Sequence, residues 1–148
     1  MKTMDSDSKA KEGAIPEEII RHVVETSGFA NHLGMKLDAV GDGRASISLD
    51  IKPIHANTQG IVHGGVICSL ADQVGPIALA SILEENQRPR SVQLDVHYLS
   101  AAKGGRLTAN AVIVKSGRSV SFCDIEISDD NGRMVAAGRM TLAVVTLG

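Results

Sequence analysis

The segment that most constrains the fold of this chain is a long apolar run from Gly64 to about Glu84. Its apolar residues recur on nearly every side of a helix rather than on one stripe, which predicts a helix that is buried on most of its surface. Gly75-Pro76 lies inside this segment, and the missing proline N–H predicts a kink just after Asp72. A chain of 148 residues can bury such a helix only by packing the rest of a single domain around it.

The remaining segments alternate apolar and polar residues, as half-buried strands do. Strands are predicted at 35–40, 44–51, 90–100, 106–116, 119–128 and 134–147. The first two flank Gly41-Asp42-Gly43 and should form a hairpin, and the later ones are joined by glycine-containing turns. A helix is predicted at 15–27 with Pro16 in its first turn, and a short turn or helix at 29–34.

This order of elements predicts an α+β fold in which an antiparallel sheet surrounds a central helix. One domain should span residues 15–148, including its N-terminal helix. Residues 1–14 are polar and charged, and they predict a disordered tail.

Composition argues against several classes of partner. The net charge is −2, so no basic field would attract nucleic acid or anionic lipid. The aromatic residues are Phe29, Tyr98 and Phe122, too few to stack on single-stranded bases. The polar start predicts no secretory signal and no segment predicts a membrane span, so we expect a cytoplasmic protein.

The two cysteines lie inside apolar runs. Cys68 and Cys123 are therefore predicted to be small buried thiols rather than a disulfide pair. No close spacing of cysteines and histidines predicts a metal site.

The stretch from His55 to Asp72 carries the chemistry. A polar loop ends in His63-Gly64-Gly65 at the start of the apolar helix, where free backbone N–H groups can bind an anion or oxyanion. Asp72 follows on the same helix and would be costly to bury without a partner or a catalytic role. Together these features suggest a carbonyl group polarised at the helix start and attacked near a carboxylate further along.

The pattern H-x-N-x-x-G-x-x-H-G-G-x6-D, with the later segment SVQLDVHYLS, resembles the hotdog-fold thioesterases. Among them the chain is most similar to the phenylacetate-degradation-type acyl-CoA thioesterases, from about Phe29 to Leu147. The resemblance implies hydrolysis of an acyl-CoA to the free acid and coenzyme A, with no cofactor beyond the coenzyme A of the substrate. It also implies a homodimer, often paired into a homotetramer, with active sites at the subunit interface.

The resemblance assigns roles to individual residues. Gly64 would donate its N–H to the thioester oxygen, and Gly65 next to it would take part in binding the substrate. Asn57 would contact the thioester through its side chain. Asp72 would come from the neighbouring subunit as nucleophile or general base. Ser91 would help to hold the water. Negative charge develops on the carbonyl oxygen during thioester hydrolysis, and a fixed N–H contributes on the order of 3 kcal/mol to its stabilisation.

Several interpretations stay open. His63 could be a base, as in the hotdog dehydratases, or could orient the loop. Lys115, Arg118 and Ser119 surround a turn that the resemblance places near coenzyme A, but they could equally form a solvated hairpin tip. A module that binds or senses acyl-CoA without catalysis is the remaining alternative.

Overall fold

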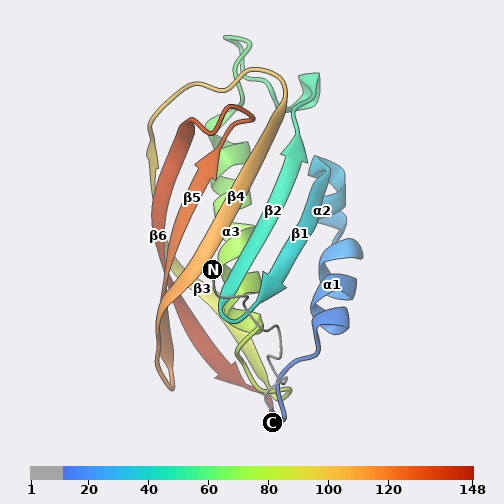
Figure 1. Cartoon of the computed structure of the whole chain (residues 1–148), viewed down its shortest axis with the longest axis vertical. Coiled ribbons are helices and arrows are strands. Elements are labelled where there is room, and N and C mark those ends of the chain that lie inside the picture. Colours follow the sequence, from blue (N-terminus) through green and yellow to red (C-terminus); the bar gives the residue numbers. More distant parts are fainter. Residues whose placement is uncertain (1–11) are drawn as a thin grey trace, which may run out of the picture.

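The computed structural model describes residues 12–148, which form one antiparallel sheet with a long helix across one face (Figure 1). The strand order is β1-β2-β4-β5-β6-β3. The elements in chain order are α1 (Glu17–Glu25), α2 (Gly28–Leu33), β1 (Met35–Gly41), β2 (Arg44–Asp50), the 3₁₀ turn η1 (Pro53–His55), α3 (Gly64–Ala80), β3 (Gln87–Tyr98), β4 (Arg106–Ser116), β5 (Val120–Ser128) and β6 (Met134–Thr146). The predicted α+β class, the hairpin and all six strands are confirmed.

Helix α3 differs from its prediction at its end. It stops at Ala80, four residues before the predicted Glu84, and it runs without a break through Gly75-Pro76. Pro76 has no N–H, so the backbone carbonyl of Asp72 lacks the hydrogen bond that a residue four positions later would normally give it.

Helix α1 is shorter than predicted, and Pro16 precedes it as the N-cap instead of lying in its first turn. The predicted tail lies almost entirely outside the described residues. At its end, Ala14 forms an isolated bridge with Glu84, and Gly13 accepts a hydrogen bond from the N–H of Glu85. These contacts attach the start of α1 to the connection between α3 and β3.

The core lies between α3 and the inner face of the sheet. Alternate residues of the strands point toward the helix and are fully buried, among them Ile47, Leu49, Leu107, Ile125 and Leu142. Gly75 of α3 packs against Met140 of β6, and an added Cβ at Gly75 would lie 2.7 Å from Met140 Sδ. Any larger residue at this position would require the methionine side chain to move.

The cysteine prediction is right for Cys123 and only partly right for Cys68. Cys123 is fully buried, and burial raises the pKa of its thiol to about 11. Cys68 is half-buried on α3, and both thiols are free.

The two edges of the sheet differ. Helices α1 and α2 lie beside β1 (Figure 1), and Arg21 Nη1 donates a 3.3 Å hydrogen bond to the carbonyl of Leu37 on that strand. Within residues 12–148 no strand pairs with the outer edge of β3, and Val92 in its middle is 64% exposed. Of the two edge strands described, β3 is therefore the one with a long edge that neither a strand nor a helix of residues 12–148 covers.

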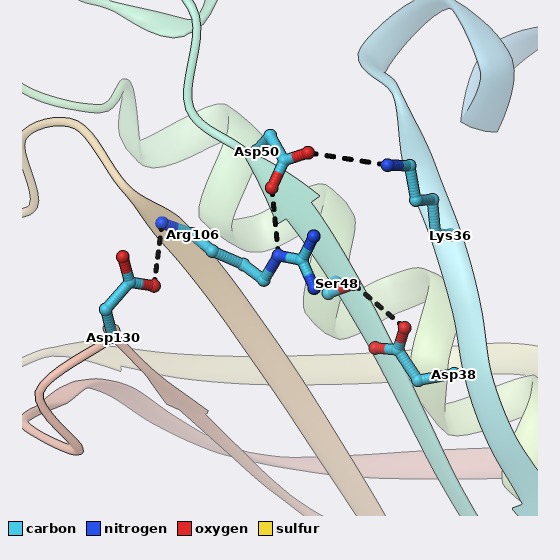
Figure 2. Close-up of polar contacts among 6 residues, drawn as sticks. All are labelled: Lys36, Asp38, Ser48, Asp50, Arg106 and Asp130. Carbon is cyan, nitrogen blue, oxygen red and sulfur yellow. Dashed lines mark hydrogen bonds and ion pairs between the residues drawn. The ribbon is translucent and has the colours of Figure 1, made fainter.

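A polar network covers the outer face of β1, β2 and β4 (Figure 2). Asp50 binds Arg106 Nε at 2.9 Å and Lys36 Nζ at 3.4 Å, and Ser48 donates to Asp38 at 3.0 Å. Ile47 and Leu49 point to the core, so Ser48 and Asp50 point away from α3. The hydrogen bond from Arg106 is the largest cause that lowers the pKa of Asp50, and the one from Lys36 adds to it.

None of the helices in the described part of the chain is both long and apolar enough to cross a membrane.

Candidate active site

His63 is the N-cap of α3. Its Nδ1 accepts a 2.8 Å hydrogen bond from the N–H of Gly65, which satisfies one of the free donors at the helix start. Since Nδ1 accepts, the neutral ring carries its proton on Nε2. In this arrangement the ring can donate a hydrogen bond outward but has no free nitrogen with which to take a proton.

Gly65 is required by this cap. A Cβ at position 65 would lie 2.9 Å from His63 Nδ1 and 3.2 Å from Cε1 of the same ring. A larger residue would push the imidazole off the helix end. The structure thus gives Gly65 a steric reason for being glycine, beside the predicted role in substrate binding.

Gly64 presents a free donor. No acceptor for its backbone N–H is found among residues 12–148, and the carbonyl of Gly64 accepts a 3.0 Å hydrogen bond from the hydroxyl of Tyr98. Partial burial raises the pKa of the Tyr98 phenol, and neighbouring Cys68 adds to the shift, so the phenol stays a donor. The Gly64 N–H has the features expected of an oxyanion donor at a helix N-terminus.

Tyr98 is a site residue that the sequence did not indicate, since there it counted only among the scarce aromatic residues. It ends strand β3 and lines a hollow together with Asn57, Gly64 and Leu99. The one signal available was its position at the end of the SVQLDVHY segment, and that position alone does not indicate contact with the glycines.

Asn57 lies in the same hollow and also shapes the loop. Its Oδ1 accepts hydrogen bonds from the N–H groups of Gln59 at 2.9 Å and Ile61 at 3.3 Å. This is the local turn geometry typical of asparagine. Its side-chain amide, for which no partner is found in residues 12–148, can still donate into the hollow beside Gly64.

His55 is buried beneath the loop that leads to α3 and holds it through hydrogen bonds to the backbone. It is 1% exposed; its Nδ1 accepts from the N–H of Lys52 at 2.9 Å, and its Nε2 lies 2.8 Å from the carbonyl of Leu33. With both ring nitrogens satisfied, His55 is a structural residue, in keeping with the absence of any predicted role for it.

Asp72 and Gly65 are the two exposed residues of α3, which is otherwise buried or half-buried, as predicted. One stripe of the helix faces away from the sheet, and Asp72 lies on it two turns beyond Gly64. Ser91 Oγ on β3 donates a 2.8 Å hydrogen bond to Asp72 Oδ1. The structure therefore brings together the predicted carboxylate and the predicted serine within one chain.

A β-bulge directs Ser91 toward the helix. Leu94 pairs with Met140 and Ser91 with Leu142, so three steps along β3 match two steps along β6. Val92 is the extra residue. Strict alternation from Leu94 would point Ser91 to the outer face, and the bulge reverses that direction.

Asp72 and Gly64 of one chain are too far apart to act on one carbonyl. Eight residues of α-helix separate them, which corresponds to about 12 Å along the axis. The predicted site residues thus form two groups within a chain: Asn57, His63, Gly64 and Gly65 at the helix start, and Asp72 with Ser91 further along.

The predicted coenzyme A contacts lie elsewhere. Lys115, Arg118 and Ser119 are exposed at the turn between β4 and β5, whereas the helix start lies beside residues 98–102, before β4 begins. The length of β4 places these two ends of the sheet about 30 Å apart. The structure does not bring the three residues to Gly64 of the same chain.

Comparison with known proteins bears on this arrangement. The model of the thioesterase superfamily matches residues 59–136, more than half of the chain, and this match includes Gly64, Asp72 and Ser91. The chain belongs to the thioesterase superfamily. Human acyl-coenzyme A thioesterase 13 is 27% identical over 128 residues, which cover 84% of this chain and 90% of the human protein.

Two solved structures show the same fold as this thioesterase. A thioesterase from Haemophilus influenzae superimposes with a TM-score of 0.84 at 24% identity, covering 94% of this chain and 96% of that one. The Escherichia coli PaaI protein, from the phenylacetic acid degradation operon, gives 0.79 at 24% identity, covering 86% and 92%. The predicted hotdog fold is confirmed, and with it the prediction of an enzyme that hydrolyses thioesters.

Proposed function

We propose that this thioesterase hydrolyses acyl-CoA to the free acid and coenzyme A at sites shared between two subunits. The observation that carries the proposal is the Ser91–Asp72 hydrogen bond on the exposed stripe of α3, with the free Gly64 N–H about 12 Å away. The likeness to human acyl-coenzyme A thioesterase 13 supports coenzyme A as the leaving group.

In the proposed reaction the thioester oxygen binds the Gly64 N–H, and Asn57 donates from its amide nitrogen. Asp72 of the other subunit takes a proton from water as the water oxygen bonds to the carbonyl carbon, or its carboxylate attacks that carbon directly. Ser91 holds Asp72 and the water in place. The tetrahedral intermediate then collapses, the C–S bond breaks, and the sulfur leaves as a thiolate that gains a proton. Attack by water gives the free acid directly. Attack by Asp72 gives an anhydride between the acyl group and Asp72, which a water molecule then hydrolyses to the free acid and the regenerated carboxylate.

The free edge of β3 supports pairing of two chains. Two copies joined antiparallel along β3 would bring the exposed stripe of one α3 near the helix start of the other. Such a dimer could supply Asp72 from one chain and Gly64 from its partner, and a pair of dimers would give the predicted homotetramer.

The cap formed by His63 counts against the dehydratase alternative, because a ring whose Nδ1 already accepts a hydrogen bond offers no base. Membership of an enzyme superfamily likewise favours catalysis over an acyl-CoA-sensing module.

A complementation experiment tests the shared site. Asp72→Asn should lower turnover by about 10² or more in a thiol-release assay with acyl-CoA, and Asn57→Ala should also be impaired. A mixed dimer contains one subunit of each variant. One of its two sites then carries both substitutions and the other carries neither, so exchange of subunits on mixing should restore activity. If mixing restores nothing while each variant stays folded and assembled, the site is not shared.

A further inference from the structure

An apolar groove runs along α3 on the side covered by α1. It encloses about 240 Å³ between α1, the C-terminal half of α3 and the start of β3. We call it the α1–α3 groove. Most of its lining is isoleucine, valine, proline and alanine, Ile19, Val23 and Ala80 among them, and its polar lining residues are Asp72, Gln73 and Arg88.

Helix α1 has a second apolar row that its packing does not require. Ile20 and Val24 are buried against the core, at 6% and 3% exposure, which suffices to attach the helix. Ile19 and Val23 are 49% and 61% exposed, and both line the groove. Apolar side chains left open to water beside a concave surface indicate a binding site.

The groove begins at the proposed reaction centre. Asp72 lies among its lining residues, and the groove continues past Pro76 to Ala80 along two turns of α3. This distance is about 12 Å, since each helical residue advances 1.5 Å. An extended polypeptide advances about 3.5 Å for three backbone bonds, so a groove of this length accommodates an extended alkyl chain of about ten carbons.

We propose that the α1–α3 groove binds the acyl chain of the substrate, and that the substrate class is straight-chain aliphatic acyl-CoA of up to about ten carbons. The inference rests on the proposed function, because it places the thioester carbon beside Asp72 with the chain directed toward Ala80. Of the lining residues, all within residues 12–148, none is aromatic, which disfavours an aryl group that would gain from stacking.

Chain-length kinetics test the proposal. With straight-chain acyl-CoA esters from butyryl to palmitoyl, kcat/KM should rise by up to about fourfold per methylene and level off near decanoyl, where the groove is filled. Phenylacetyl-CoA should be a poorer substrate than decanoyl-CoA.

Two variants and a matched control tie the preference to the groove. Ile19→Asp places a charge in the groove near the N-terminal end of α1, where an acid is tolerated, and should lower the decanoyl-to-butyryl ratio of kcat/KM at least tenfold. Ala80→Phe should move the preferred length to shorter chains by filling the far end. Phe29→Asp is the control, since Phe29 is 58% exposed on α2 outside the groove, and the ratio should stay at the wild-type value.

The outcomes separate this inference from the proposed function. Thiol release that does not depend on chain length, or an Ile19→Asp ratio no lower than that of Phe29→Asp, overturns the groove assignment and leaves acyl-CoA hydrolysis standing. A preference for phenylacetyl-CoA over decanoyl-CoA overturns the groove assignment in the same way. Absence of thiol release from every ester overturns both.

Discussion

Ser91 Oγ on strand β3 donates a 2.8 Å hydrogen bond to Asp72 Oδ1 on helix α3. The bond holds one carboxylate oxygen, and no hydrogen-bond partner of Asp72 Oδ2 is found among residues 12–148. In the proposed reaction Ser91 therefore acts by holding Asp72. The structure thus links the position of the proposed catalytic carboxylate to a bulge in the neighbouring strand.

We expect Ser91→Ala to lower kcat by about tenfold, less than Asp72→Asn does, because the carboxylate remains but is no longer held. Ser91→Thr keeps the hydroxyl and should restore part of the loss. Steady-state thiol-release kinetics would measure both, with kcat and KM determined separately. An effect on KM alone would assign Ser91 to substrate binding instead.

His63 is expected to act through the helix start. Removing an N-cap side chain costs about 1 kcal/mol, so His63→Ala should lower the free energy of unfolding by that amount and reduce turnover modestly. Asparagine is a good N-cap and cannot act as a base. Urea unfolding and thiol release of His63→Asn should therefore approach the wild-type values, whereas a persistent loss of activity in a stable His63→Asn protein would make His63 a catalytic base.

The stability of the protein should depend on pH through Asp50. Its pKa is lowered in the folded state from the ordinary 3.8, so the contribution of its ion pairs is complete above that value. It is lost as the pH falls through the lowered folded-state pKa. Asp50→Asn should therefore be less stable than wild type in urea unfolding at about pH 7, and the difference should shrink progressively as the pH falls below 3.8.

Added salt gives the control for this prediction. Asp50 and Arg106 are each about half exposed, so the difference at neutral pH should shrink as the salt concentration is raised. A difference that persists unchanged at low pH and high salt would assign the effect to packing rather than charge.

Ser121 offers a stabilising substitution. Its side chain is fully buried on β5, and its Oγ has no hydrogen-bond partner among the residues that the structure describes. Leaving a buried hydroxyl unsatisfied is costly, so Ser121→Ala should raise the free energy of unfolding by about 1 kcal/mol. Thermal and urea unfolding would measure it, and a loss of stability would show that the hydroxyl has a partner after all.

Much of the fold could be predicted because local patterns and tertiary packing agree. The alternation in β2 and the turn at Gly41-Asp42-Gly43 indicated the first hairpin, and β4 was predicted with its observed bounds. The end of α3 was predicted too late because the apolar run continues through Ile82 and Leu83, which pack against the core from a turn rather than from a helix.

The site was only partly predictable for a different reason. Residues close in sequence, such as His63 and Gly65, could be assigned to one structural feature. The direction of Ser91 depends on a bulge that is defined only by pairing with β6, and the contact of Tyr98 with Gly64 joins two distant segments. Local sequence carries no signal for either. The exposure of Asp72 had no local signal either, because Asp72 is one acid among apolar neighbours on a helix that is mostly buried, as predicted.

The unequal edges of the sheet limit how the protein can aggregate. At β1 the carbonyl of Leu37 accepts a hydrogen bond from Arg21, and two helices lie alongside, so an incoming strand would meet these helices there. In the part of the chain that the structure describes, no strand pairs with the outer edge of β3. When two copies pair through β3, the free edge of each copy becomes paired. No further copy can then add to the sheet, so a continuous sheet of many copies cannot form. Strand addition would end at the pair, which protects a protein with a long exposed strand from forming fibres.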